Sequence, residues 1–265
     1  MPVFNPHSLE PIGVFDSGVG GLSVLRQLLR LLPQEDFVYL ADTAWAPYGE
    51  RSEDDIRRRC LDITQYLVRA HAIKALVIAC NTATAAAASL LREHFPTLPL
   101  IGIEPAIKPA ASLTRTGHIG VMATRATVGS ARFQQLARTW GTNCHLHILA
   151  CNGLALSIEN ALENHPNPDG ETVRSLCERY MHELSPFVGQ DSAHGIDTLV
   201  LGCTHYPLLT GVLGGFTTFS AFALDTTVLW QRGDSGLAMG YVLASVVLSL
   251  AAVSAGLAIG RGIFA

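Results

Sequence analysis

Two short apolar runs, each ending in a cysteine, limit the folds open to this chain more than any other feature of the sequence. The first run extends from Leu76 to Ala79 and precedes Cys80, and the second extends from Thr198 to Gly202 and precedes Cys203. Each run has the length and apolar character of a β-strand buried on both faces, as in the parallel sheets of α/β proteins. The sequence therefore predicts two buried parallel strands, each with a thiol at its carboxyl end.

The residues that follow Cys80 predict a helix. Asn81 and Thr82 are candidate N-caps, and Ala83 opens an Ala-rich run. A thiol between the end of a strand and the start of a helix lies where open α/β sheets bind ligands, and the helix dipole there favours an anion. That anion is either a ligand carboxylate or the thiolate itself. A single cysteine after a strand is more often a small buried apolar residue, so its position alone assigns no function.

A second pair of similar segments indicates an internal duplication. Residues Ile12 to Leu28, IGVFDSGVGGLSVLRQL, resemble Ile119 to Leu136, IGVMATRATVGSARFQQL, and each segment precedes one of the strands that end in cysteine. The order strand-turn-helix, then strand-cysteine-helix, therefore occurs twice. This order predicts an α/β fold of two pseudo-symmetric, doubly wound parallel-sheet halves that face a central cleft. The first half is expected over residues 1–105 and the second over residues 106–209.

The composition excludes several classes of protein. The chain has 265 residues and a net charge of -4, so it can form two modest domains but has no basic surface for nucleic acid. None of its six cysteines forms a C-x-x-C pair, which argues against a disulfide scaffold and against a structural zinc site, and no metal is expected. The segment from Met1 to Pro11 lacks the charged and apolar regions of a signal peptide. A cytoplasmic location is therefore expected for residues 1–209.

The chain changes character after Leu209. Between Ser235 and Gly260 there is no charged residue, and this segment is longer than the roughly 20 residues that span a bilayer. Val212 to Trp230 is a second apolar segment. Residues 210–265 are therefore expected to form two hydrophobic helices of a membrane-seeking tail, with buried core helices as the alternative.

Two thiols from facing halves suit a reaction that treats the two faces of one carbon atom alike. One thiolate removes a proton from one face and the opposite thiol delivers a proton to the other face, which racemises the carbon without a cofactor. A thiolate is a base near neutral pH only if its pKa is lowered or a neighbour accepts its proton. Asp16 ends an adjacent strand and His205 lies two residues after Cys203, so both are candidate helpers. A structural histidine is the alternative for His205.

Short polar side chains gather at the expected strand ends and are candidates for binding a small, multiply charged substrate. The core motifs contain no Lys or Arg, so backbone N–H groups and helix termini are expected to hold the substrate carboxylates. These polar residues are Ser17, Tyr48, Asn81, Thr82, Thr124 and Thr204.

Four separated motifs together resemble those of bacterial glutamate racemase: FDSGVGGLSVL, the DT at Asp42-Thr43 followed by PYGERS, ACNTATA, and LVLGCTHYPLL. The resemblance extends over about residues 12–209. It implies interconversion of L- and D-glutamate without pyridoxal phosphate, which supplies D-glutamate for peptidoglycan and the cell wall. It also implies a homodimer.

The same resemblance assigns roles to individual residues. Cys80 and Cys203 would be the two acid/base thiols, one for each enantiomer. Asp16 and His205 would assist their nearest thiols, and Glu159 matches a carboxylate near the second thiol. The residues that would hold the substrate are Asp16, Ser17, Tyr48, Gly49, Asn81, Thr82, Thr204 and His205.

The tail resembles a different family. GGFTTFSAF and the apolar segment after it, about residues 211–261, are similar to the second half of small bacterial fluoride channels. By this resemblance Phe219 and Phe222 would match pore-lining residues, and Gly214 and Thr217 a structural sodium site. The first two helices of such a channel have no counterpart here, so the chain is interpreted as a fusion of two incomplete genes.

Three alternatives to glutamate racemisation remain open from the sequence. The first is another two-cysteine isomerase, such as aspartate racemase. The second is a membrane protein whose tail assembles with other chains to conduct fluoride. The third is a folded but inactive fusion remnant.

Overall fold

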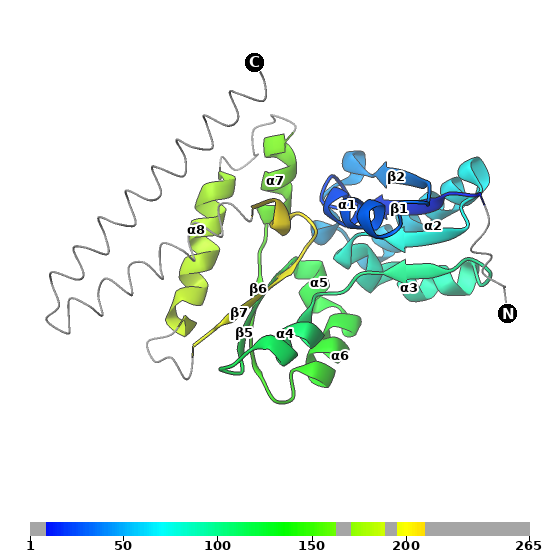
Figure 1. Ribbon diagram of the computed structural model, residues 1–265. Helices are drawn as coiled ribbons and strands as arrows, with labels where there is room; N and C mark the ends of the chain where they lie inside the picture. The colour runs from blue at the N-terminus through cyan, green and yellow to red at the C-terminus, as the bar shows by residue number, and fades with distance from the viewer. Residues whose placement is uncertain (1–8, 163–170, 189–194, 210–265) are drawn as a thin grey trace, which may run out of the picture. The chain divides into compact units, whose positions relative to one another are not determined.

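The computed structural model describes residues 9–162, 171–188 and 195–209. In this part of the chain two parallel sheets are each flanked by helices (Figure 1). The first sheet has the strand order β2-β1-β3-β4. Its strands are β1 (Ile12–Asp16), β2 (Phe37–Ala41), β3 (Ala75–Ile78) and β4 (Leu100–Gly102).

Helices cover both faces of the first sheet. Phe15 and Ile78 point to one face, where they pack with residues of α2 (Glu53–His71) and α3 (Asn81–His94). Val14 and Val77 point to the opposite face, because side chains alternate along a strand, and α1 (Leu22–Leu31) packs there. Burial on both faces explains why β3 is apolar along its whole length and β1 is apolar as far as Phe15.

The second sheet has the strand order β6-β5-β7. Its strands are β5 (His118–Ala123), β6 (His145–Ala150) and β7 (Thr198–Gly202). Helices α4 (Ile107–Leu113) and α6 (Ala131–Trp140) pack on it through a core that contains Ile107, Phe133 and Val121. Helices α7 (Leu154–Leu162) and α8 (Val173–Leu184) contact each other on the other side of the strands in Figure 1.

Short helices complete the connections within the described part of the chain. They are η1 (Thr43–Trp45), η2 (Tyr48–Glu50), α5 (Arg125–Gly129), η3 (Ser185–Phe187) and η4 (Tyr206–Leu209).

The parallel α/β architecture expected from the sequence is confirmed. The strand orders β2-β1-β3 and β6-β5-β7 correspond, so the duplication holds for three strands, whereas β4 has no counterpart among the described strands of the second sheet. The repeated helix is also not identical in the two halves. Where the first half has α1, the second half breaks at Ser130, whose hydroxyl accepts a hydrogen bond from the N–H of Phe133 and starts a new helix.

The cap of α3 differs from the expected one. Asn81 and Thr82 were the candidate caps, but the N-cap is Cys80, whose sulfur accepts a hydrogen bond from the N–H of Ala83 at 3.4 Å. The strand ends early enough that the thiol itself occupies the cap position. The first thiol therefore lies directly at the positive end of a helix dipole.

The expected hydrophobic tail, with Gly214, Thr217, Phe219 and Phe222, lies outside the described residues. Within residues 9–162, 171–188 and 195–209, no helix combines the length and the apolar character needed to cross a bilayer.

Candidate active site

The chemically reactive side chains follow the carboxyl ends of the central strands in both sheets. Asp16 ends β1, and Cys80 comes two residues after β3. In the second sheet, Thr124 follows β5 and Cys203 follows β7. Because β1 and β5 correspond, as do β3 and β7, the two thiols occupy equivalent places in the two halves. The repeated pattern in the sequence predicted this placement.

The first thiol is enclosed by groups of its own half. Cys80 is 4% exposed, and its sulfur donates a hydrogen bond to the hydroxyl of Ser17 at 3.6 Å. Burial, followed by the negative charge of Asp16, raises the pKa of Cys80 well above its ordinary value, against the effect of the Ala83 N–H. A charge on Cys203 is a further, smaller cause that raises the pKa of Cys80.

Asp16 connects the two halves. It is fully buried, its Oδ2 accepts a hydrogen bond from the N–H of Gly21 at 2.8 Å, and its Oδ1 accepts one from the hydroxyl of Thr204 at 3.3 Å. Burial raises the pKa of Asp16, although the charge of His205 and the Gly21 N–H oppose this. A carboxylate with a raised pKa beside a thiol can accept the proton of that thiol.

The second thiol is paired with a histidine. The sulfur of Cys203 lies 3.8 Å from Nδ1 of His205, and Nε2 of His205 lies 2.6 Å from Oε2 of Glu159. Burial lowers the pKa of His205, but its contacts with Cys203 and Glu159 outweigh burial and raise the pKa to about 10. At neutral pH both ring nitrogens are therefore protonated, one facing the thiol and the other facing the carboxylate.

Glu159 reaches across from the second half to the first. Both of its carboxylate oxygens accept a hydrogen bond from the N–H of Val19 at 3.2 Å, and the residue is 4% exposed. Gly18 makes this approach possible, because a Cβ atom there would lie 2.5 Å from the carboxylate oxygens. The structure thus brings Glu159 together with His205 and with the turn after β1.

Three hydroxyls form a buried cluster between the halves. The hydroxyl of Thr82 lies 2.9 Å from that of Thr124 and 3.1 Å from that of Thr127, and Thr124 donates to Thr127 at 2.9 Å. Sequence reasoning identified Thr82 and Thr124 but missed Thr127. The spacing Thr-x-x-Thr at the start of α5, where Thr124 is the N-cap, is the signal that could have revealed it.

Tyr48 and Gly49 lie in the loop before α2, as expected, but the phenol of Tyr48 is already engaged. It donates a hydrogen bond to Oδ2 of Asp42 at 2.6 Å, and Tyr48 is 1% exposed. Gly49 lies against the second half, because a Cβ atom there would come within 2.8 Å of the Cβ of Thr124. Sequence reasoning did not identify Asp42 as part of the site.

Asn81 faces a different space from its neighbour Thr82. It lines a small cavity together with Glu104 and Pro105, and its buried Oδ1 has no hydrogen-bond partner among the described residues. Thr82 instead lines a larger pocket.

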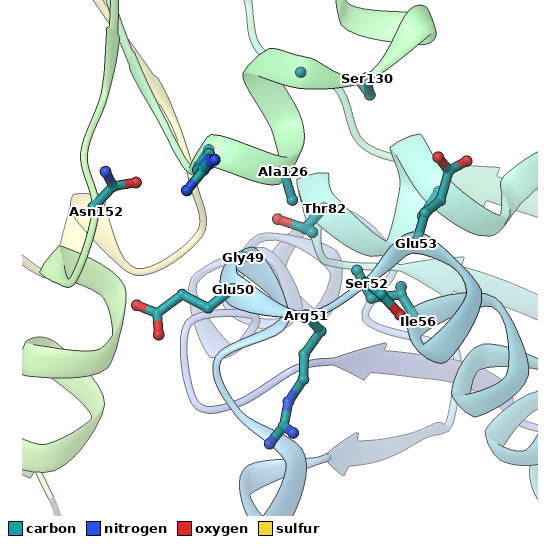
Figure 2. Close-up of a pocket in the computed structure, with 13 residues that line it drawn as sticks. Gly49, Glu50, Arg51, Ser52, Glu53, Ile56, Thr82, Ala126, Ser130 and Asn152 are labelled. Atoms are coloured by element: carbon teal, nitrogen blue, oxygen red, sulfur yellow. The ribbon is translucent and has the colours of Figure 1, made fainter.

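The larger pocket has a volume of about 800 Å³ and two walls (Figure 2). One wall is formed by the segment from Gly49 to Glu53, and the other by Ala126, Ser130 and Asn152. Neither Cys80 nor Cys203 is among the lining residues. Of the expected site residues, Gly49 and Thr82 line it. No cluster of three or more His, Cys, Asp or Glu in the described ranges is arranged to hold a metal ion.

This chain is similar in sequence and in fold to known proteins. The Asp/Glu/Hydantoin racemase family matches residues 12–217. The glutamate racemase of Ectopseudomonas mendocina is 47% identical over 219 residues, which cover 83% of this chain and 78% of that protein. The match to the family extends beyond Leu209, where the resemblance was expected to end.

Two solved structures are similar to this one. Escherichia coli glutamate racemase, in complex with L-glutamate and the activator UDP-MurNAc-Ala, has a TM-score of 0.66 and 36% identity, covering 76% of this chain and 72% of that one. Francisella tularensis glutamate racemase, in complex with D-glutamate, has a TM-score of 0.59 and 33% identity, covering 76% and 71%. With its parallel α/β halves and its two thiols at equivalent strand ends, this chain belongs to the Asp/Glu/hydantoin racemase family.

Proposed function

We propose that this protein is a glutamate racemase that interconverts L- and D-glutamate with two cysteine bases and no cofactor. The observation that carries the proposal is the equivalent position of Cys80 and Cys203 at the carboxyl ends of β3 and β7. The family supports a racemase, and the curated relative and the solved structures named above are glutamate racemases.

The two thiols act on opposite faces of the α-carbon. A thiolate on one side takes the α-proton, the electron pair of the broken C–H bond remains on the α-carbon, and the opposite thiol gives its proton to the other face. The electron pair is delocalised into the α-carboxylate, which the N–H groups at the start of α3 can stabilise. After one turnover the two cysteines have exchanged protonation states, and in this state the enzyme accepts the other enantiomer.

Asp16 serves Cys80 in this mechanism. The Cys80 thiol is neutral at neutral pH because burial raises its pKa, so it needs a group that accepts its proton before it can act as base. Asp16 contacts this thiol, and its own raised pKa suits it to hold that proton.

His205 and Glu159 serve Cys203. A protonated imidazole stabilises the thiolate of Cys203 through Nδ1, while the Glu159 carboxylate holds the charge on the ring through Nε2. A nucleophile or base beside an oriented histidine is the usual arrangement of an activated thiol, which supports Cys203 as the second base. The two thiols therefore have different helpers, a carboxylate in the first half and an imidazolium in the second.

Substrate binding uses polar groups around both thiols. Thr82 and Thr124 are hydrogen bonded to each other, so bound glutamate replaces that bond with its own. Tyr48 contributes its backbone and ring, because its hydroxyl is committed to Asp42. The residues proposed to hold the substrate are Asp16, Ser17, Tyr48, Gly49, Asn81, Thr82, Thr124, Thr204 and His205.

The two halves, residues 1–105 and 106–209, are proposed to close on the substrate as separate domains. Helix α4 supports this boundary, because Ile107 at its start packs in the core of the second sheet. The product, D-glutamate, is proposed to supply peptidoglycan synthesis for the cell wall.

A proton-exchange measurement tests the reaction. The purified full chain is incubated with L-glutamate in deuterated buffer, and the optical rotation and the α-proton NMR signal are followed together. We expect the optical rotation to fall to zero while the D-glutamate formed carries deuterium at the α-carbon. L-aspartate in a parallel sample separates glutamate racemase from aspartate racemase. An unchanged optical rotation with both amino acids would refute the proposed function.

We further propose that the protein is a cytoplasmic homodimer. Sedimentation of the purified chain at several concentrations measures this directly, and a mass of one chain at all of them would exclude the dimer. Fractionation of cells tests the location, and it also tests whether residues 210–265 take the chain to the membrane.

A further inference from the structure

We propose that Arg59 is a positioning residue of the active site, because through Asp42 it fixes Tyr48 and the loop that forms one wall of the pocket. This inference rests on the proposed function, since its effect is measured on glutamate racemisation. Arg59 itself does not line the pocket; it lies on α2, the helix that follows this loop in the chain.

Asp42 is hydrogen bonded to Asp16, Arg59 and Tyr48, and these contacts form the Asp42 network. It follows β2, its N–H donates to the carbonyl of Asp16 at 3.0 Å, and it is 4% exposed. Arg59 donates two hydrogen bonds to the Asp42 carboxylate, from Nε to Oδ2 at 2.8 Å and from Nη2 to Oδ1 at 2.5 Å. Two parallel bonds of this kind fix orientation as well as charge, so the Asp42 carboxylate has one defined position.

Tyr48 is the link from this carboxylate to the site. Its hydroxyl donates to the oxygen that Nε of Arg59 also contacts, Oδ2 of Asp42. The Tyr48 ring belongs to the same buried apolar cluster as Cys80. The position of the Asp42 carboxylate therefore determines where this ring packs in the core around the first thiol.

The aromatic ring of Trp45 packs against the guanidinium group of Arg59. The guanidinium carbon of Arg59 lies 5.3 Å from the Trp45 ring centre, and that of Arg51 lies at the same distance. Arg51 also donates from Nε to the carbonyl of Trp45 at 3.3 Å. Its side chain runs away from Thr82 and Ala126 in Figure 2, so it packs the loop rather than filling the pocket.

Gly49 connects the Asp42 network to the second half of the molecule. This residue follows Tyr48, lines the pocket and lies so close to Thr124 that no Cβ atom fits. Among the described ion pairs Arg59 is the charged partner of Asp42, so its removal leaves a buried carboxylate unpaired there, which is costly enough to change the protonation or the position of Asp42. The loop then shifts against Thr124, and the space for substrate between the two walls changes with it.

Substitution of Arg59 tests this role, with Arg58 as the matched control. Arg58 is the neighbouring residue on α2, its side chain is 75% exposed, and it pairs only with Asp55 among the contacts described. We expect Arg59→Gln to raise the KM for glutamate about tenfold while kcat falls much less, because displaced walls weaken binding. Arg59→Lys keeps the charge but cannot make both hydrogen bonds to the carboxylate. Its KM for glutamate should therefore lie between that of Arg59→Gln and that of the wild type. Arg58→Gln should match the wild type.

A double-mutant cycle separates positioning from a general loss of stability. Tyr48→Phe removes the hydroxyl that receives the effect of Arg59 but keeps the ring. If Arg59 acts through this hydroxyl, Arg59→Gln changes KM far less in the Tyr48→Phe background than in the wild type. Additive effects, or an unchanged KM in Arg59→Gln with racemisation intact, would overturn the positioning role alone. A wild-type chain that does not racemise glutamate would instead refute the proposed function, and the positioning role with it.

Discussion

At the scale of single residues, the two thiols differ in the groups that surround them. Cys80 caps a helix and has a neutral hydroxyl and a buried carboxyl beside it, whereas Cys203 faces a histidine. The sequence predicted Asp16 and His205 as helpers from their positions near the thiols. It could not show that one pKa is raised by burial and the other by contacts that outweigh burial.

Removing one thiol should leave an enzyme that exchanges only one enantiomer. In Cys203→Ala the Cys80 thiol can still remove a proton from one face of the α-carbon and return it to that face. In Cys80→Ala the Cys203 thiol does the same on the opposite face. We expect racemisation to fall by about 10²–10⁴-fold in each variant, which is the usual contribution of a general acid or base. NMR in deuterated buffer should show α-exchange of one enantiomer in the first variant and of the opposite enantiomer in the second.

The control for this experiment is Cys144→Ala, because Cys144 is a free cysteine that belongs to neither thiol site. It should racemise glutamate like the wild type. Exchange of both enantiomers by a single-thiol variant would contradict the two-base mechanism.

The pair formed by His205 and Glu159 should make stability depend on pH. The pKa of His205 is raised from 6.5 to about 10 in the folded protein, so its stabilising effect is complete below about pH 6.5. The effect is lost as the pH rises through about 10. We expect the difference in unfolding free energy between the wild type and His205→Asn to be largest near pH 6 and to shrink toward pH 10, as measured by urea unfolding. A difference that grows with pH would show that His205 is neutral in the fold.

At the scale of elements, the sequence predicted the two strands that precede the thiols to within one residue. The run expected as a strand at Leu76–Ala79 is β3 at Ala75–Ile78, and the run expected at Thr198–Gly202 is β7. Buried parallel strands can be recognised in a sequence because the side chains on both faces are apolar. The ends of the elements were less predictable, because they depend on caps such as the Cys80 thiol and the Ser130 hydroxyl.

The contact between the η2 loop and α5 should be sensitive to a single added methyl group. In Gly49→Ala the new Cβ would lie 2.8 Å from the Cβ of Thr124, so the two walls of the pocket must move apart. We expect kcat/KM to fall about tenfold or more, since displacement of binding groups by about 1 Å is costly. Steady-state kinetics on both enantiomers should give equal losses, because the equilibrium constant of a racemisation is one.

Gly129→Ala is the matched control for this change. Gly129 lines the same pocket, but a Cβ atom there would meet nothing within 4 Å. Its kcat/KM should equal that of the wild type. An equal loss in both variants would mean that the contact with Thr124 does not control the site.

At the scale of the whole molecule, two similar halves meet through buried polar contacts. Thr204 donates to Asp16, Glu159 accepts from Val19, and the hydroxyl cluster joins α3 to α5. Contacts of this kind hold the two halves, and with them the two strand ends that carry the thiols, in one arrangement. The halves are therefore expected to work as one catalytic unit.

Removal of metals and cofactors should leave the reaction unchanged. We expect the full chain to racemise glutamate at the same rate after dialysis against EDTA, and also after treatment with hydroxylamine, which removes pyridoxal phosphate. The control is the same preparation dialysed without either reagent. A loss of activity that an added divalent metal or pyridoxal phosphate restores would contradict the cofactor-independent mechanism.

The sequence by itself determined the parallel α/β class, the duplication and the thiol at the end of each central strand, because these follow from local apolar patterns. The tertiary structure decided which side chains meet across the halves. Asp16 and Thr204 are 188 positions apart, and Val19 and Glu159 are 140 positions apart, so no local pattern relates them. The contacts of Asp42, Arg59 and Thr127 also emerged only from the fold, because a hydrogen-bond network depends on distances that the packing of whole elements sets.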